Sequence, residues 1–148
     1  MATWMNRPRQ RIRPLGLAVQ DLHLRRRFPG FVAERGNGVW TWRGSLQPRA
    51  SSPVYRVSIQ CRQGRVPVVR VLSPALAPNA PHLYRGGALC LYWPEEWRWY
   101  GDELIAETIV PWTASWLFYY ELWLDTGKWL GPSSHAQASP KSESDRAA

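Results

Sequence analysis

The sequence predicts an α+β fold, in which a helix precedes an antiparallel sheet and further helices follow it. Apolar residues recur at helical spacing over residues 15–28. Three β-rich segments, 39–46, 54–61 and 66–72, then follow one another with short turns between them, which is typical of an antiparallel meander. An aromatic stripe at helical spacing over residues 112–123 predicts a helix after the sheet.

The length of 148 residues allows one domain with its own core and is too short for two domains of ordinary size. We expect a basic flexible arm over residues 1–14, a single domain over 15–131 and a disordered tail over 132–148, because the tail is rich in Ser, Ala and Pro. No stretch is apolar enough to cross a bilayer and no secretory leader is evident, so we expect a cytoplasmic protein that does not enter the membrane.

The formal net charge of +8 divides unevenly along the chain. Residues 1–94 carry fifteen arginines and two acidic residues, a net charge of +13, whereas residues 95–148 carry four basic and nine acidic residues, a net charge of −5. A basic half is typical of proteins that bind nucleic acid, an anionic membrane or an acidic protein. The arginines are spread over several elements without a recognition-helix or zinc-finger pattern, so we do not expect nucleic acid as the partner.

The first helix ends in a basic cluster, Arg25, Arg26 and Arg27, where cations favour the helix dipole. Such a cluster is either a solvated surface or a docking site. The opposite side of the predicted helix holds Gln20 and His23. The predicted buried face consists of Leu15, Ala18, Val19, Leu22 and Leu24.

Two helices are predicted after the sheet. Asp102 is placed to cap a short helix over residues 103–109, and Pro111 is expected to break it and to begin a second helix that ends at Gly127. The second helix carries the aromatic stripe, which is more typical of a core than of a ligand platform. The stripe consists of Trp112, Trp116, Tyr119 or Tyr120, and Trp123.

Cys90 is the residue around which the prediction of function is built. It lies between Leu89 and Leu91, directly after the pair Gly86-Gly87. Glycines permit a tight turn, on which a thiol would be exposed and held in place as a nucleophile. The alternative is a buried strand in which Cys90 is a small apolar filler.

The other cysteine, Cys61, lies among strand residues and is interpreted as structural. Cys61 and Cys90 have no metal-ligand spacing, and no leader suggests a disulfide between them. We therefore expect reduced thiols, no metal and no cofactor.

The order of helix, meander, cysteine loop and C-terminal helices resembles the ubiquitin-conjugating enzyme fold, over roughly residues 15–131. His82 and Cys90 are eight positions apart, as in that family, and Gly87-Ala88-Leu89-Cys90-Leu91 matches its cysteine motif. Residues 68–74 resemble its third strand and the following proline. Leu83 and Tyr84 replace the family's Pro and Asn, so the amide that supports the loop and the oxyanion is missing.

The sequence is most similar to bacterial conjugating proteins of antiphage systems, type II CBASS in particular. The matching positions are His82 and Tyr84, residues 89–94, and then Pro111, Trp112, Trp116, Leu117, Tyr120, Glu121, Trp123, Thr126, Gly127, Trp129 and Gly131.

This resemblance implies a protein-conjugating acyltransferase that carries a partner's C-terminus as a thioester on Cys90. The implied partners are an activating enzyme, which would dock on Arg25, Arg26 and Arg27, and either a CBASS nucleotide cyclase or a ubiquitin-like protein. His82, Tyr84 and Gly87 would support the site, and backbone amides of residues 86–90 would be available to an oxyanion. The alternatives are a non-catalytic partner-binding variant of the same fold, a cysteine hydrolase using Cys90 and His82, and a basic nucleic-acid-binding module.

Overall fold

The computed structural model describes residues 13–92 and 97–132. The predicted tail beyond Pro132 and most of the predicted basic arm lie outside these ranges. Two helices and four strands follow one another along the described chain, which is an α+β arrangement: α1 (Leu17–Arg27), β1 (Val32–Gly36), β2 (Val39–Leu46), β3 (Tyr55–Arg62), β4 (Val68–Ser73) and α2 (Ile109–Thr126).

The four strands form one antiparallel sheet in the order β1-β2-β3-β4, as the predicted meander requires, but with one strand more than predicted. The additional strand, β1, pairs with β2 through a tight turn at Asn37-Gly38, where both residues have positive φ. An Asn-Gly pair is typical of such hairpin turns. The strand itself has little alternation of apolar and polar residues, because four of its five residues are exposed at the edge of the sheet.

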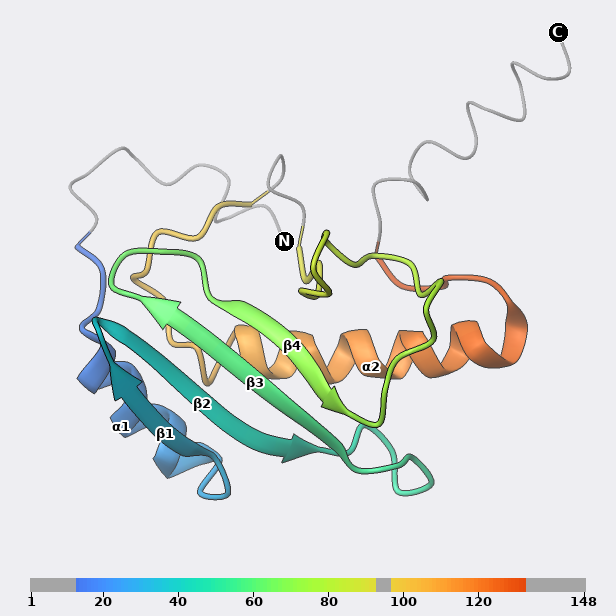
Figure 1. Ribbon diagram of the computed structural model, residues 1–148, viewed down its shortest axis with the longest axis horizontal. Helices are drawn as coiled ribbons and strands as arrows, with labels where there is room; N and C mark the ends of the chain where they lie inside the picture. Colours follow the sequence, from blue (N-terminus) through green and yellow to red (C-terminus); the bar gives the residue numbers. More distant parts are fainter. Residues whose placement is uncertain (1–12, 93–96, 133–148) are drawn as a thin grey trace, which may run out of the picture.

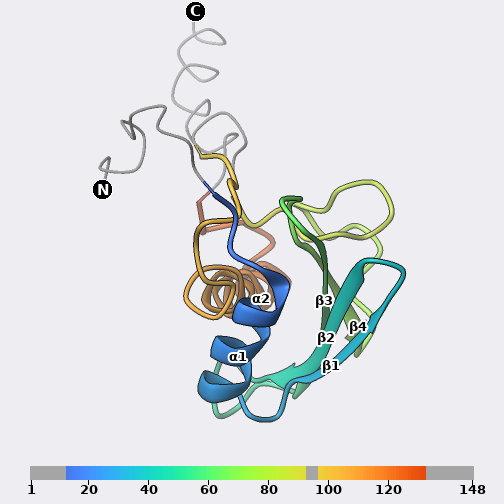
Figure 2. The ribbon, with the colours of Figure 1, turned by 90° about the vertical axis from the view of Figure 1, so that its left-hand side faces the viewer.

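Both helices lie on the same face of the curved sheet (Figures 1 and 2). The core fills the space between them. It consists of inward-facing sheet residues, among them Trp42, Val57 and Ile59, and of apolar residues from α2 and the segment before it, among them Ile109 and Leu117. Within the described part of the chain, neither helix combines the length and apolar character that a membrane span needs.

Helix α1 is rotated relative to the prediction and begins at Leu17. Its buried residues are Gln20, Asp21 and Leu24, whereas Val19 and Leu22 are each 42% exposed. The polar residues are buried because each has hydrogen-bond partners. The Gln20 amide donates to the carbonyl of Glu103 at 2.7 Å and accepts from the amide of Ile105 at 2.8 Å.

Asp21 connects α1 to the sheet. Its carboxylate accepts a hydrogen bond from Trp42 Nε1 at 3.0 Å and pairs with Arg25 at 2.9 Å. Apolar periodicity placed Leu24 correctly in the core, but it was wrong for Val19 and Leu22, because the helix also packs through the hydrogen-bonded side chains of Gln20 and Asp21.

The C-terminal part contains one helix, α2, where two were predicted. Residues 105–108 form turns, and Pro111 lies within the first turn of α2, where its missing N–H is not needed. Gly127 ends the helix with a φ of 75°, and its N–H donates to the carbonyl of Trp123, as predicted. Of the aromatic stripe, Trp116 and Tyr120 are buried, and Trp112 and Trp123 are half-buried.

Candidate functional site

Cys90 ends a small hairpin formed by residues 82–90, which we call the cysteine hairpin. Its two arms meet at an isolated antiparallel bridge between Leu83 and Leu89. The Cys90 amide donates to the carbonyl of His82 at 3.0 Å, and the Tyr84 amide donates to the carbonyl of Ala88 at 2.8 Å. The predicted tight bend is therefore confirmed, and Cys90 does not lie in a regular strand of the sheet.

The cysteine hairpin is attached to the edge of β4. The Leu89 amide donates to the carbonyl of Val69 at 2.9 Å, and Arg70 Nε donates to the carbonyl of Gly86 at 3.4 Å. Leu89 is only 4% exposed, so its side chain anchors the hairpin in the core. These contacts hold the backbone of Cys90 in place, which a positioned nucleophile requires.

Gly86 and Gly87 form the tip of the hairpin with φ values of 92° and 87°. Other residues rarely adopt this left-handed conformation, so the glycine pair is required by the turn. The amides of Gly87, Leu89 and Cys90 already donate within the fold, to Tyr84, Val69 and His82. The expectation that backbone amides of residues 86–90 are available to an oxyanion is therefore wrong for these three.

His82 supports Cys90 through its backbone. Its carbonyl accepts hydrogen bonds from the Cys90 amide and from Trp116 Nε1, the latter at 3.2 Å. The residue has a φ of 56°, and its ring lies 4.7 Å from the ring of Trp129. His82 thus links the cysteine hairpin to α2.

Tyr84 brings a hydroxyl group to the cysteine. Partial burial, followed by a side-chain hydrogen bond with Cys90, raises the pKa of Tyr84 above its ordinary value. A phenol is protonated at neutral pH even at its ordinary pKa, so the Tyr84 hydroxyl has a proton to donate. The residue as a whole is 47% exposed.

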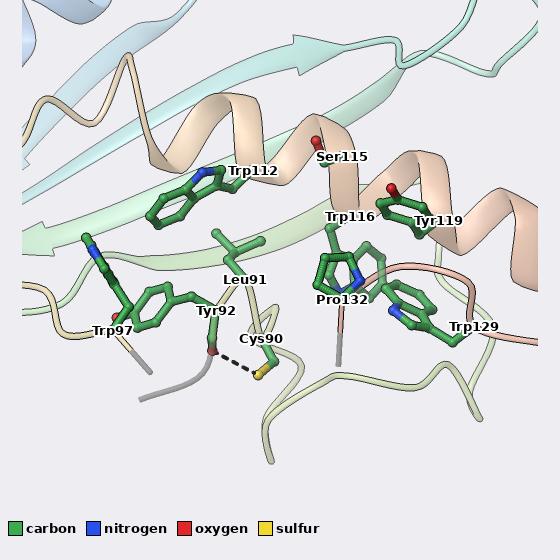
Figure 3. Close-up of a pocket in the computed structure, with 10 residues that line it drawn as sticks. All are labelled: Cys90, Leu91, Tyr92, Trp97, Trp112, Ser115, Trp116, Tyr119, Trp129 and Pro132. Carbon is green, nitrogen blue, oxygen red and sulfur yellow. Dashed lines mark hydrogen bonds between the residues drawn. The ribbon is translucent and has the colours of Figure 1, made fainter. Parts of the chain in front are cut away.

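The Cys90 side chain is half-buried and opens on a pocket of about 370 Å³, which we call the aromatic pocket (Figure 3). Its Sγ lies 3.6 Å from the carbonyl oxygen of Tyr92. One wall of the pocket is a face of α2, and the other walls come from the chain after Cys90 and from the chain after α2. The lining residues are Cys90, Leu91, Tyr92, Trp97, Trp112, Ser115, Trp116, Tyr119, Trp129 and Pro132.

The rings of the aromatic pocket hold one another in place. Trp97 meets Trp112 edge to face with centroids 4.9 Å apart, and Tyr92 meets Trp97 at 4.7 Å. On the other side, Trp116 and Trp129 lie 5.4 Å apart. Edge-to-face pairs of this kind are favourable beyond their buried area, so the walls are formed before any ligand arrives.

A second pocket of about 450 Å³, which we call the sheet-side pocket, lies against the other side of the cysteine hairpin. It shares Leu91, Tyr92 and Trp97 with the aromatic pocket, but Cys90 does not line it. Its remaining lining residues are Val66, Pro67, Val68, Tyr84, Ala88, Leu89, Arg98 and Trp99.

Cys61 has the structural position that was predicted for it. It lies in β3, is 4% exposed, and its Sγ is within 3.4 Å of the carbonyls of Arg62 and Arg65. Burial raises the pKa of Cys61 to about 11. Within the described ranges, no group of three or more His, Cys, Asp or Glu side chains is arranged to hold a metal ion.

Arg25, Arg26 and Arg27 are exposed at the end of α1, apart from the cysteine hairpin. Arg25 pairs with Asp21, and Arg27 lies over the ring of Phe28 at 5.9 Å. The structure therefore brings His82 and Tyr84 to Cys90, places Gly87 at the tip of the same hairpin, and leaves the arginines on α1.

Sequence reasoning did not predict that the aromatic stripe would form part of this site. Trp112, Ser115, Trp116 and Tyr119 lie three or four residues apart, so they share one face of α2 and line the aromatic pocket together. That spacing was visible in the sequence. What the sequence does not contain is the position of the cysteine hairpin opposite this face.

Comparison with known proteins places this geometry in a family. The model of the type II CBASS E2 protein family matches residues 20–136, which is most of the chain and includes the cysteine hairpin and α2. The predicted resemblance to conjugating proteins of CBASS is thereby confirmed. No curated protein matches the chain.

Proposed function

Because the chain belongs to the type II CBASS E2 protein family, we propose that it is a conjugating enzyme of bacterial antiphage defence. In this proposal, Cys90 carries the C-terminus of a partner protein as a thioester and passes it to an amine. The partner is the CBASS nucleotide cyclase or a ubiquitin-like protein. The observation that carries the proposal is the position of the Cys90 thiol. It is half-buried, lies at the end of a hairpin held by backbone hydrogen bonds, and opens on the aromatic pocket.

The first step is thioester exchange with an activating enzyme. The Cys90 thiolate attacks the carbonyl carbon of the donor thioester, a C–S bond to Cys90 forms, and the C–S bond to the activating enzyme breaks with release of its thiolate. The exchange is nearly neutral in energy, so position and access matter more than driving force. The bonded hairpin supplies the position, and the opening to the aromatic pocket supplies the access.

The second step is aminolysis. The neutral acceptor amine attacks the thioester carbon, a C–N bond forms, the C–S bond breaks, and Cys90 leaves as a thiolate while the amine loses a proton. The tetrahedral intermediate needs a hydrogen-bond donor for its oxyanion. Since the amides of Gly87, Leu89 and Cys90 are engaged, we assign this role to the Tyr84 hydroxyl, which remains protonated beside Cys90. His82 positions the loop through its carbonyl and is not assigned as a base.

The activating enzyme would dock on the exposed face of α1. This face combines the cations Arg25 and Arg26 with the exposed apolar residues Val19 and Leu22, which suits an acidic surface with an apolar centre. Because this face lies apart from Cys90, docking leaves the thiol free to react.

The test is adduct formation measured by intact mass. The full-length protein is incubated with the cyclase, the activating enzyme and ATP, and we expect a protein adduct that reductant removes. Cys90→Ser should give a reductant-resistant ester or no adduct. Cys61→Ser is the matched control and should leave the adduct unchanged, because a serine hydroxyl can also donate to the carbonyls of Arg62 and Arg65.

An adduct that persists in a Cys90→Ala variant would refute the assignment of the nucleophile. Specific binding of the cyclase without any adduct would instead favour the non-catalytic variant of the fold. Replacing Arg25 and Arg26 by Glu should slow adduct formation with the activating enzyme. It should not change the reaction of Cys90 with a small thioester, which requires no docking.

A further inference from the structure

The two pockets beside the cysteine hairpin differ in their relation to the thiol. Cys90 lines the aromatic pocket and does not line the sheet-side pocket. An acyl group bonded to Sγ therefore lies at the mouth of the aromatic pocket. The carried protein is bonded to Cys90 through its C-terminal carbonyl, so the residues nearest the aromatic pocket are the last residues of that protein.

The chemistry of the aromatic pocket selects among side chains. Among the residues that the structure describes, its lining includes four tryptophans and two tyrosines, and no carboxylate, Lys or Arg. The tyrosines and tryptophans of this wall are uncharged at neutral pH, and burial, followed by the proximity of Cys90, raises the pKa of Tyr92 further, to about 12. A charged side chain buried here would have no ionic partner among the lining residues, and unpaired burial of a charge is costly. The sheet-side pocket, by contrast, is lined in part by Arg98.

We propose that the aromatic pocket is a specificity subsite for a bulky apolar side chain next to the terminal residue of the carried protein. The substrate class is thus a protein C-terminus whose penultimate residue is apolar. This inference rests on the proposed function, because it assigns a ligand to the same thiol. A volume of about 370 Å³ is near the lower end for ligand pockets, which suits one or two side chains and not a folded domain.

The rigid walls make the pocket selective. Trp116 is fixed by its hydrogen bond to His82, and Trp97 and Trp112 are fixed by their edge-to-face contact. A side chain that enters this pocket therefore loses its water without rearranging the walls. Burying a leucine-sized side chain is expected to accelerate acylation of Cys90 roughly ten- to a hundredfold over alanine at that position.

The experiment uses synthetic peptide thioesters that end in Xaa-Gly, with Xaa as Leu, Phe, Ala, Asp or Lys. The Cys90 thiolate attacks the glycine carbonyl, a new C–S bond forms, and the small thiol leaves, so no activating enzyme is needed. The rate of Cys90 acylation on the full-length protein is followed by intact mass. We expect the Leu and Phe peptides to react fastest and the Asp and Lys peptides slowest.

Two variants of matched bulk identify the pocket. Ser115 is exposed on the α2 wall of the aromatic pocket, and Val66 is exposed in the sheet-side pocket. Ser115→Trp should fill the aromatic pocket, so the rate of Cys90 acylation by the Leu peptide should fall to the rate given by the Ala peptide. Val66→Trp should leave the preference for Leu unchanged. Circular dichroism of both variants verifies that they fold.

The outcomes separate the inference from the function on which it rests. Equal rates for all peptides, with Cys90 acylated, would overturn the subsite and leave the proposed function standing. A faster reaction with the Lys peptide than with the Leu peptide would also overturn the proposed subsite. So would a preference for Leu that is lost in Val66→Trp and kept in Ser115→Trp. If no peptide acylates Cys90 while the cysteine still reacts with a small alkylating agent, both the subsite and the proposed thioester function fail.

Discussion

Replacing Gln20 by Leu should destabilise the domain, because the Gln20 amide joins α1 to the segment that leads into α2. The residue is 2% exposed and makes hydrogen bonds of 2.7 and 2.8 Å to the backbone of Glu103 and Ile105. Leucine has a similar size but leaves a carbonyl and an amide without partners. Each costs about 1–3 kcal/mol, partly offset by burial of apolar surface, so we expect a loss of about 2–4 kcal/mol in the free energy of unfolding.

Urea denaturation followed by circular dichroism measures this loss, and the thermal midpoint should fall by roughly 5–15 °C. Leu22→Gln is the control on the same helix, because Leu22 is exposed and a surface substitution of this kind changes the free energy of unfolding by about 0.5 kcal/mol or less. A Gln20→Leu protein within this margin of the wild type would show that the two hydrogen bonds do not hold α1 in place.

Three further predictions concern packing and titration. Gly44→Ala should lower the free energy of unfolding, measured in urea, by about 1–3 kcal/mol, because a Cβ there would lie 2.5 Å from the Phe31 ring. Gly30→Ala is the control and should leave the free energy of unfolding unchanged, because a Cβ at Gly30 would have nothing within 4 Å. At about pH 8, iodoacetamide should modify Cys90 and spare Cys61, because burial raises the pKa of Cys61 to about 11. In urea, where the chain is unfolded, both cysteines should react. Two adducts on the folded protein would contradict this prediction. Burial and the nearby Glu121 raise the pKa of Tyr55 to about 12 in the folded protein, so its contribution to stability is complete below about pH 10 and is lost as the pH rises toward 12. The fall in stability over this interval, measured by urea denaturation, should be shallower in Tyr55→Phe.

The meander could be predicted because β2, β3 and β4 have alternating residues and turn signals that act locally. The edge strand β1 could not be recognised by alternation, since its side chains mostly face solvent. Part of the face of α1 was predicted wrongly for a related reason. Periodicity counts apolar residues, whereas Gln20 and Asp21 are buried through partners that lie 83 and 21 residues away in the chain.

The local part of the site followed from spacing. Gly86 and Gly87 indicated a tight bend before Cys90, and the structure has that bend. The bond of the Leu89 amide to Val69 and the packing of α2 against the hairpin could not be predicted, because they depend on contacts with β4 and α2. The contact between Trp116 and the carbonyl of His82 joins residues 34 positions apart.

That contact gives the thiol a dependence on the whole domain. The cysteine hairpin is bonded to β4 through Leu89 and to α2 through Trp116, so the sheet and the last helix both hold it. A chain cut before α2 would keep the residues that bond the cysteine hairpin to β4, but it would lack the Trp116 bond to His82 and the α2 wall of the aromatic pocket. The thiol and the wall that faces it thus come from distant parts of the sequence, and both parts are needed for the proposed subsite.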